Sequence, residues 1–260
     1  MNKICMKLIC TLIMFIVLTG CEKNVEKKDS ALAIDPIAEK VTMPPEFASL
    51  AIDKAGGIVA WGKVRHLQLD CIVTFYNQDA GNYLTEQKCD VFPWSNSIII
   101  AGTESRKSYK WQLSQGKFDI LQGTGEISNF KNQIKSSCYA EAIFNLVTAP
   151  VRFMDKSFVF TREATEQNIQ GRWCYPITGE HKSESSVSNI TFYQNKADSM
   201  IDMVLLTCAD DDTCFLVCGY DYMQVRDAGI SIPKRIEIHL ADKQGFAKRQ
   251  LFRIDVSSEK

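Results

Sequence analysis

Apolar and polar residues alternate over residues 61–123 of the 260-residue chain, and no segment of helical periodicity interrupts them. Over residues 64–76 the odd positions from Leu67 to Phe75 are apolar and the even positions are mostly polar. Because successive side chains of a strand point to opposite faces, this alternation predicts a strand with one apolar face. Turn signals divide the stretch into an antiparallel meander. Its expected strands cover residues 64–76, 83–92, 97–102, 107–114 and 117–122.

Two other segments have a helical pattern. Residues 45–55 begin with a proline and end at a glycine pair, which indicates a short helix before the sheet. Residues 128–149 also repeat with helical spacing; Ser128 or Asn129 can cap the helix, and Pro150 is expected to end it. The second half of this helix is apolar nearly all round. It is therefore either sandwiched in the core or placed as a lid over an apolar concavity.

The remainder of the chain returns to strands separated by turn residues. Long runs of strands at such spacing indicate a barrel or a strongly curved sheet. Pro233 is expected to begin a strand, because proline cannot donate a hydrogen bond within a central ladder. The predicted fold class is mainly β (α+β): a curved antiparallel sheet or half-barrel with covering helices. The further strands are expected at residues 153–161, 171–177, 190–194, 200–209, 213–225, 234–240 and 250–256.

The first residues have the order of a secretory signal. Lys3 and Lys7 precede an apolar run over residues 8–18, and the run leads into Leu18-Thr19-Gly20-Cys21. The run is shorter than the roughly 18 residues that a spanning helix needs, and it ends in small residues before a cysteine. This lipobox resembles that of bacterial lipoprotein precursors, which implies cleavage after residue 20 and a diacylglycerol on Cys21. The alternative is an ordinary signal or anchor helix with a chance cysteine.

Removal of residues 1–20 leaves a charged segment over residues 21–44, which can bury too little apolar surface to fold. It is expected to be a lipidated N-terminus and flexible tether for a single half-barrel-like domain, residues 45–260. Residues 1–20 contain two of the 30 basic residues and no acidic residue, so the cleaved chain would have 28 basic and 31 acidic residues. This balance offers no basic face for nucleic acid. Glu22 after the lipidated cysteine favours anchoring in the outer membrane of a bacterial envelope, facing the periplasm.

Aromatic positions in the meander give a second resemblance. Pro93-Trp94 ends a strand and is followed by an apolar strand around Ile98, by Tyr109-Lys110-Trp111 and by Gly116-Lys117-Phe118. This order is similar to that of the LolA and LolB group of periplasmic lipoprotein carriers. The resemblance implies a half-barrel whose concave apolar face binds acyl chains. The arginine that the family has after its proline and aromatic tract is absent here, where serine follows Trp94.

Cysteine pairing can be predicted only from hairpin register. Two of the ten cysteines leave with the signal and Cys21 is acylated, so seven remain and at least one stays unpaired in a monomer. A turn centred on Ala80 would place Cys71 opposite Cys89, within the range that a disulfide can span, and export permits oxidation. The alternative for this pair is two small buried thiols.

Cys208, Cys214 and Cys218 flank an acidic tract at residues 210–212, and this grouping also suggests a metal site. Zinc sites combine thiolates with histidines, and no histidine lies near this tract in sequence. If the tract is a hairpin tip centred on Asp211, Cys208 lies opposite Cys214, and a disulfide is the simpler account. We expect no metal and no other cofactor.

The remaining candidates for a functional site are apolar. They could line a pocket for acyl chains, or they could form the core between sheet and helix. The favoured hypothesis is a module that binds a hydrophobic ligand, either a lipid or the acyl chains of another lipoprotein. The alternative is a non-enzymatic structural or interaction lipoprotein of an envelope complex with a filled core, and its protein partner is unknown. The candidate pocket residues are Trp61, Trp94, Ile98, Ile100, Trp111 and Phe118.

We expect that the protein is not an enzyme. Two segments, at residues 114–117 and 128–131, match the Ser-x-x-Lys pattern of some hydrolases. The first falls on a predicted hairpin turn, whereas that chemistry requires the start of a buried helix.

Overall fold

The computed structural model describes residues 45–77, 81–104, 106–125, 134–181 and 186–259. The expected signal sequence at 1–20, Cys21 and the tether at 21–44 lie outside the described residues, as do the expected helix caps Ser128 and Asn129. The helices are α2 (Glu46–Lys54), α3 (Ile58–Trp61), α4 (Ser136–Val147) and α5 (Ala149–Arg152), with a 3-10 turn η1 (Pro93–Ser95). None of them is long and apolar enough to cross a membrane.

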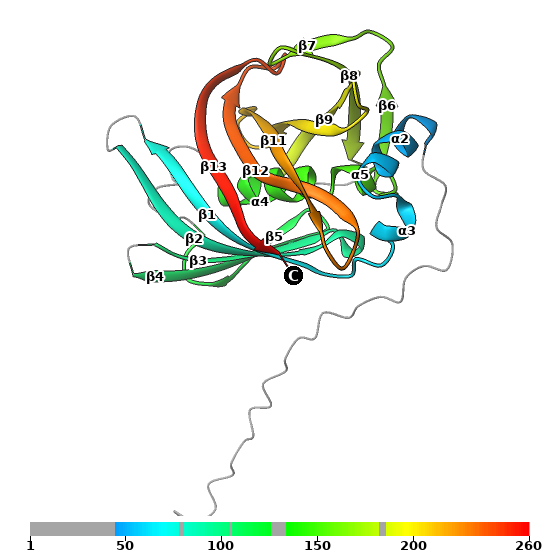
Figure 1. Cartoon of the computed structure of the whole chain (residues 1–260). Coiled ribbons are helices and arrows are strands. Elements are labelled where there is room, and N and C mark those ends of the chain that lie inside the picture. The colour runs from blue at the N-terminus through cyan, green and yellow to red at the C-terminus, as the bar shows by residue number, and fades with distance from the viewer. Residues whose placement is uncertain (1–44, 78–80, 105, 126–133, 182–185, 260) are drawn as a thin grey trace, which may run out of the picture. The chain divides into compact units, whose positions relative to one another are not determined.

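The described strands all belong to one antiparallel sheet (Figure 1). Their order is β5-β4-β3-β2-β1-β13-β12-β11-β10-β9-β8-β6, and β7 pairs with β8. The last strand of the chain thus lies between the first strand and β12 and joins the two halves. The strands are β1 (Leu67–Asn77), β2 (Gly81–Phe92), β3 (Ser97–Glu104), β4 (Lys107–Ser114), β5 (Lys117–Gln122), β6 (Phe158–Arg162), β7 (Gln167–Ile169), β8 (Arg172–His181), β9 (Val187–Asn195), β10 (Ile201–Cys208), β11 (Cys214–Val225), β12 (Ile230–Ala241) and β13 (Ala247–Glu259).

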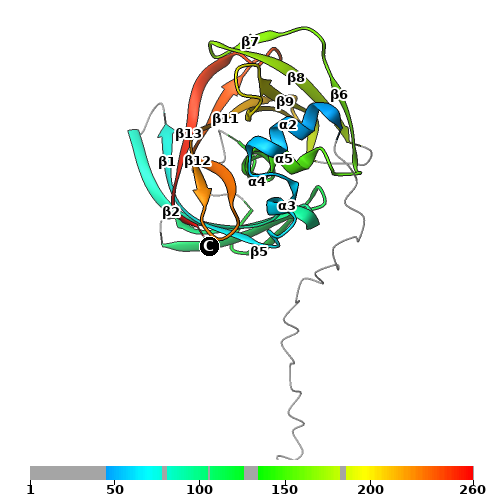
Figure 2. The same ribbon diagram turned by 45° about the vertical axis from the view of Figure 1, so that its right-hand side comes forward.

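The sheet curves around helix α4, with α2 and α5 packed against each other nearby (Figures 1 and 2). This arrangement confirms the predicted fold class, a mainly β half-barrel with covering helices. Two details differ from the expectation. Pro150 does not end the helical region but lies in the first turn of α5, where its missing N–H costs nothing. Phe153 follows α5 in a helical conformation, so the strand that was expected from residue 153 begins at Phe158.

The prediction that Pro233 begins a strand is also wrong, because Pro233 lies inside β12 and pairs with Tyr222 of β11. On its other side β12 pairs with β13 only from Arg235 onward. Two residues before the proline, the N–H of Ser231 donates to the carbonyl oxygen of Ala55 at 3.0 Å, and Ala55 belongs to no strand. The backbone N–H groups of residues i and i+2 point to the same edge of a strand, so the nitrogen of Pro233 points to the same edge as that of Ser231. No neighbouring strand pairs with β12 at this place on that edge, so the missing N–H of proline costs no ladder hydrogen bond.

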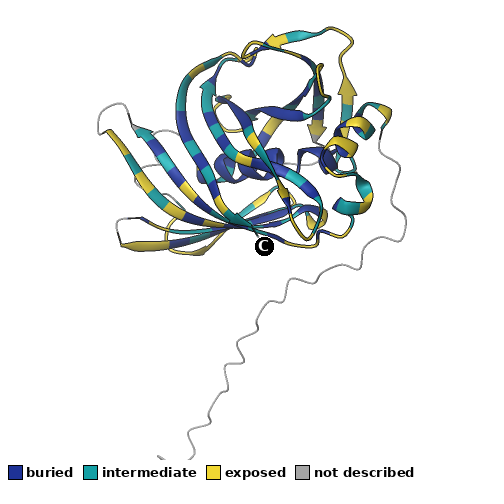
Figure 3. Cartoon of the chain, in the orientation of Figure 1, coloured by how far each residue is buried: buried dark blue, intermediate teal, exposed yellow. Residues whose placement is uncertain are grey.

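The core has two parts, on opposite faces of the sheet. The larger part fills the concave side around α4, a helix that is buried along nearly its whole length (Figure 3), and it includes Val204 and Leu206 of β10. The alternate positions of the same strand, Met203 and Leu205, belong to a smaller cluster on the other face. Burial on both faces explains why β10 is a continuous apolar run and not an alternating one.

Candidate ligand-binding site

Helix α4 occupies the concave side of the half-barrel. Eleven of its residues are buried, with Ser137 the exception, and it packs against β3 and β4 of the first half and β10, β11 and β12 of the second. The Tyr139 hydroxyl donates to Gln87 Oε1 at 2.8 Å, and Gln87 Nε2 donates to the Tyr109 hydroxyl at 2.6 Å. The position of α4 in the core confirms the first of the two alternatives for this helix.

The apolar residues that were proposed for a pocket belong to the core. Four of them, Trp61, Ile98, Ile100 and Trp111, have no exposed side-chain surface and lie in the concave cluster. Phe118 is partly buried against the same cluster. Trp94 is 36% exposed, and its indole N–H donates to the Trp61 carbonyl oxygen at 3.1 Å. The side chains that line the cavities described below are different ones.

A cavity of about 310 Å³ opens where the two halves of the sheet approach α4 and α5. The end of β4, the β4–β5 turn and the start of β6 all contribute to its lining. The cavity is lined by apolar side chains and by a polar group around one arginine. The lining residues are Asn96, Leu113, Gln115, Gly116, Glu141, Phe144, Arg152, Asp155, Ser157 and Phe158.

Arg152 is the centre of this site and is only 5% exposed. Its Nε donates to Asn145 Oδ1 at 2.9 Å, and its Nη1 donates to Asn96 Oδ1 at 2.8 Å and to Asp155 Oδ2 at 2.7 Å. Asn145 in turn donates to Glu141 Oε2 at 2.8 Å. Burial lowers the pKa of Arg152, while the carboxylates of Asp155 and Glu141 act to raise it. The charged guanidinium therefore links α4, α5 and the first half of the sheet.

Two aromatic rings enclose the arginine. Its guanidinium carbon lies 5.1 Å from the centre of the Phe144 ring and 4.9 Å from that of Phe158, distances at which cation–π attraction operates. Both rings also line the cavity, together with the buried side chain of Leu113. The site can thus accept an apolar group against the rings and one polar group beside the guanidinium.

Sequence reasoning missed this arginine network. The available signal was charge in apolar surroundings: Arg152 stands in the run Ala-Pro-Val-Arg-Phe-Met, and Glu141 lies in the helix that is otherwise apolar nearly all round. Charged residues are almost never fully buried unless they are paired. Such positions mark a buried polar site even without an alignment.

The predicted cysteine pairs are wrong in the structure. The β1–β2 hairpin pairs Asn77 with Gly81, so its centre lies one residue before Ala80, and Cys71 faces Gln87 while Cys89 faces Leu69. Both thiols are free and buried. The hydrogen bond with Cys71, then burial, raise the pKa of Cys89. The alternative of two small buried thiols therefore holds.

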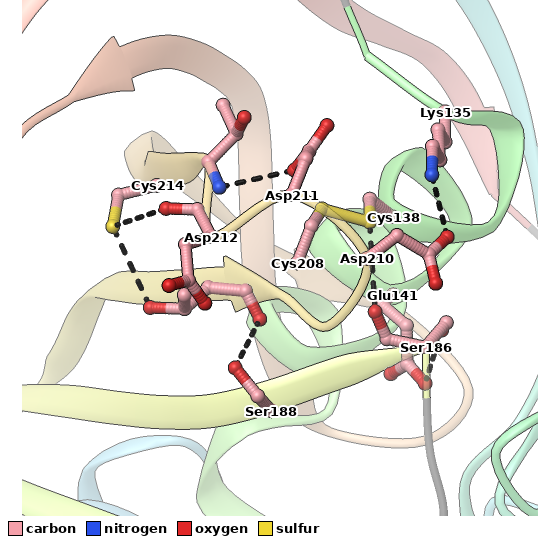
Figure 4. Close-up of a disulfide and its surroundings, with 12 residues drawn as sticks. Lys135, Cys138, Glu141, Ser186, Ser188, Cys208, Asp210, Asp211, Asp212 and Cys214 are labelled. Carbon is pink, nitrogen blue, oxygen red and sulfur yellow. Dashed lines mark hydrogen bonds and ion pairs between the residues drawn. A yellow bond between two sulfur atoms is a disulfide. The ribbon is translucent and has the colours of Figure 1, made fainter.

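Cys208 forms a disulfide with Cys138 of α4, and not with Cys214 (Figure 4). The backbone N–H of Cys208 donates to the Thr213 carbonyl oxygen, and Cys214 pairs with Thr207, one residue away from the expected register. Cys208 consequently points to the concave side and Cys214 to the smaller cluster on the other face.

The acidic tract beside this disulfide makes local contacts. Asp210 pairs with Lys135 at 2.5 Å, and Asp211 Oδ1 accepts a hydrogen bond from the backbone N–H of Thr213 at 3.0 Å, which lowers the pKa of Asp211. Over the part of the chain that the structure describes, no three His, Cys, Asp or Glu side chains gather as metal ligands would.

A wider groove of about 540 Å³ lies on the opposite face of the sheet, between β7–β8 and the β12–β13 turn. The side chains of Trp173 and Phe246 line it and are more than half exposed. Its lining lacks a buried charged group comparable to Arg152, so the cavity beside α4 is the better candidate for a specific ligand.

Comparison with known proteins identifies the fold. No family model and no curated protein matches the chain. Among solved structures, a LolA superfamily protein from Nitrosomonas europaea superposes with a TM-score of 0.52 at 10% identity, over 84% of this chain and 94% of that one. The fold is LolA-like. This likeness confirms the resemblance that the aromatic positions of the meander indicate.

Two further structures show weaker similarity to the LolA-like fold of this chain. A DUF1329 family protein from Desulfovibrio piger has a TM-score of 0.46 at 13% identity, over 82% of this chain and 91% of that one. A putative outer membrane lipoprotein-sorting protein domain from Vibrio parahaemolyticus has a TM-score of 0.43 at 9% identity, over 82% and 92%.

Proposed function

We propose that the protein is a lipid-anchored lipoprotein of the bacterial envelope that binds a hydrophobic ligand without catalysis. The ligand is a lipid or the acyl chains of another lipoprotein. The observation that carries the proposal is the cavity beside α4, where Leu113, Phe144 and Phe158 face an opening in a LolA-like half-barrel. Each methylene that leaves water contributes about 0.8 kcal/mol to binding, so an acyl chain can be held without any covalent step.

The lipobox supports the anchored half of the proposal. Diacylglycerol on Cys21, after removal of residues 1–20, fixes the protein to a membrane, and residues 21–44 then separate the half-barrel from the bilayer. Glu22 favours the outer membrane, with the domain in the periplasm. In this position the protein meets lipids and acylated proteins, which are the ligands that the cavity would take.

The ligand-binding half is tested by titrating the full-length protein with a fluorescent methyl ester of a long-chain fatty acid. Phe158→Glu places a carboxylate on the cavity wall, and we expect it to weaken binding by about tenfold, since it removes apolar contact of one to two methylenes. Val159→Glu is the matched control, because Val159 is the next residue of β6 and is 53% exposed. Binding that does not saturate, or equal effects of the two substitutions, would contradict the proposal.

A second candidate function follows from the burial of α4. Because this helix fills the concave side together with the proposed pocket residues, the half-barrel could serve as a scaffold that docks to an envelope complex. Purification of the lipidated protein separates the two functions. A co-purifying lipid supports the binding module, whereas a stable protein partner with an empty cavity supports the scaffold.

A further inference from the structure

One donor of Arg152 is left over in the cavity. Nε and Nη1 donate to Asn145, Asn96 and Asp155, whereas Nη2 has no hydrogen-bond partner among the residues that the structure describes. Among the described residues, the side-chain nitrogen and oxygen atoms that are both fully buried and without a hydrogen-bond partner do not include Nη2. Nη2 therefore keeps some exposed surface, and Arg152 lines the cavity. An otherwise buried guanidinium thus offers N–H groups to a bound molecule.

The charges around the cavity restrict what this donor can bind. The guanidinium is already compensated by Asp155 at 2.7 Å, and the carboxylate of Glu141 lines the same cavity. A carboxylate or phosphate entering beside Nη2 would therefore meet two acidic side chains in a partly desolvated site, where like charges repel strongly. An uncharged acceptor, such as a carbonyl oxygen, accepts the hydrogen bond without this repulsion.

We propose that the cavity recognises the neutral ester group of a fatty-acyl chain, with the ester carbonyl oxygen accepting a hydrogen bond from Arg152 Nη2 and the adjacent methylenes lying between Leu113, Phe144 and Phe158. This inference rests on the proposed function and names the chemical group that selects the ligand. Acyl esters come from two sources, a membrane diacylglyceride and the acylated N-terminus of a lipoprotein, and both present the same carbonyl.

The wild-type protein provides the first test. Methyl palmitate, palmitate at neutral pH and the hydrocarbon of equal length are each used to displace the fluorescent probe from the full-length protein. We expect the ester to bind about tenfold more tightly than the hydrocarbon, as a hydrogen bond from a charged donor predicts, and more tightly than palmitate. Equal affinity of ester and hydrocarbon, or tightest binding of palmitate, would overturn ester recognition and leave the apolar binding function intact. Absence of binding by all three would end both proposals.

Arg152→Lys assigns the preference to the guanidinium, because lysine keeps the charge and loses the second terminal nitrogen. We expect this variant to bind ester and hydrocarbon with similar affinity. Arg172→Lys is the matched control, since Arg172 also pairs with an aspartate, Asp202, and stacks on a ring, Tyr220, but does not line the cavity. An ester preference that persists in a folded Arg152→Lys variant would refute the role of Nη2. If this variant fails to fold, the wild-type ligand series still decides.

The source of the ester is resolved by two more ligands. A diacylglycerol and a synthetic cysteine lipopeptide with an S-diacylglyceryl group carry the same esters on different heads. Tighter binding of the lipopeptide assigns the site to lipoproteins, and tighter binding of the diacylglycerol assigns it to membrane lipid. Failure of both to compete, when methyl palmitate does, would overturn the assignment of the cavity to natural acyl esters.

Discussion

Arg152 illustrates what a single charge requires when it lies in the core. Its cost of desolvation is offset by hydrogen bonds to two asparagines and by Asp155, which also accepts hydrogen bonds from the backbone N–H and hydroxyl of Ser157. The arginine therefore holds together the segments that line the cavity, and only its Nη2 has no hydrogen-bond partner among the described residues.

Loss of the acidic partner is expected to destabilise the protein. Asp155→Asn removes the carboxylate that contacts the buried guanidinium and leaves only the more distant Glu141, and breaking a buried pair in this way typically costs about 3 kcal/mol of unfolding free energy. Urea denaturation measures the loss. Asp119→Asn is the control, because Asp119 pairs with Lys117 on the surface, and we expect a change within about 0.5 kcal/mol. Equal stability of the two variants would show that the Arg152–Asp155 pair is not a structural contact.

Gly102 of β3 is required by the tyrosine hydroxyl that faces it. A Cβ at this position would lie 2.3 Å from the Tyr109 hydroxyl oxygen, which accepts a hydrogen bond from Gln87. Gly102→Ala is therefore expected to lower the unfolding free energy by about 1–3 kcal/mol through overpacking. Thermal unfolding checks this, with Ala101→Ser on the other face of β3 as the control. A Gly102→Ala variant as stable as wild type would show that the hydrogen-bonded side chains of Tyr139, Gln87 and Tyr109 can shift without loss of stability.

At the scale of elements, the sequence predicts strands well where the alternation is strict. The bounds of β4 and β5 agree with the expected residues 107–114 and 117–122, because Tyr109, Trp111 and Leu113 alternate with polar residues between clear turns. Register is harder to predict. A shift of one residue in a hairpin centre moves each cross-strand partner by two positions, which is why Cys71 faces Gln87 and not Cys89.

Contacts between distant elements could not be predicted from local pattern. The partner of Cys208 is Cys138, which lies 70 residues earlier and on a helix. The insertion of β13 between β1 and β12 likewise depends on pairings that no local turn specifies. The Arg152 network combines residues from η1–β3, α4 and α5 for the same reason. Periodicity identified the elements, and tertiary packing decided how they meet.

The Cys138–Cys208 disulfide attaches α4 to the end of β10. With a separation of 70 residues, loop-closure entropy predicts a loss of about 4 kcal/mol in unfolding free energy for Cys208→Ser. Urea denaturation in oxidising buffer measures it. Cys214→Ser removes a neighbouring buried thiol that is free, and we expect a smaller loss. A reducing agent should lower wild-type stability to that of Cys208→Ser; indifference of the wild type to reduction would mean that the disulfide does not form in solution.

At the scale of the whole molecule, the proposed lipid anchor on Cys21 would keep the half-barrel near the lipids and lipoproteins proposed as its ligands. We expect the protein extracted from cells to carry diacylglycerol on Cys21 and to sediment with membranes. Cys21→Ser should lose the lipid mass and leave the membrane fraction, because serine lacks the thiol to which the proposed diacylglycerol is attached. Intact-protein mass spectrometry and fractionation follow both effects. Membrane association that survives Cys21→Ser would remove the lipid anchor from the account.

The central claim is that the cavity between Arg152, Phe144 and Phe158 holds an acyl ester, and native mass spectrometry of the lipidated protein purified from its own membranes tests it most directly. We predict one non-covalent adduct with the mass of an acylated glyceride or lipopeptide, which is retained in Val159→Glu and lost in Phe158→Glu. A spectrum without an adduct, or an adduct that both variants retain, would contradict the claim.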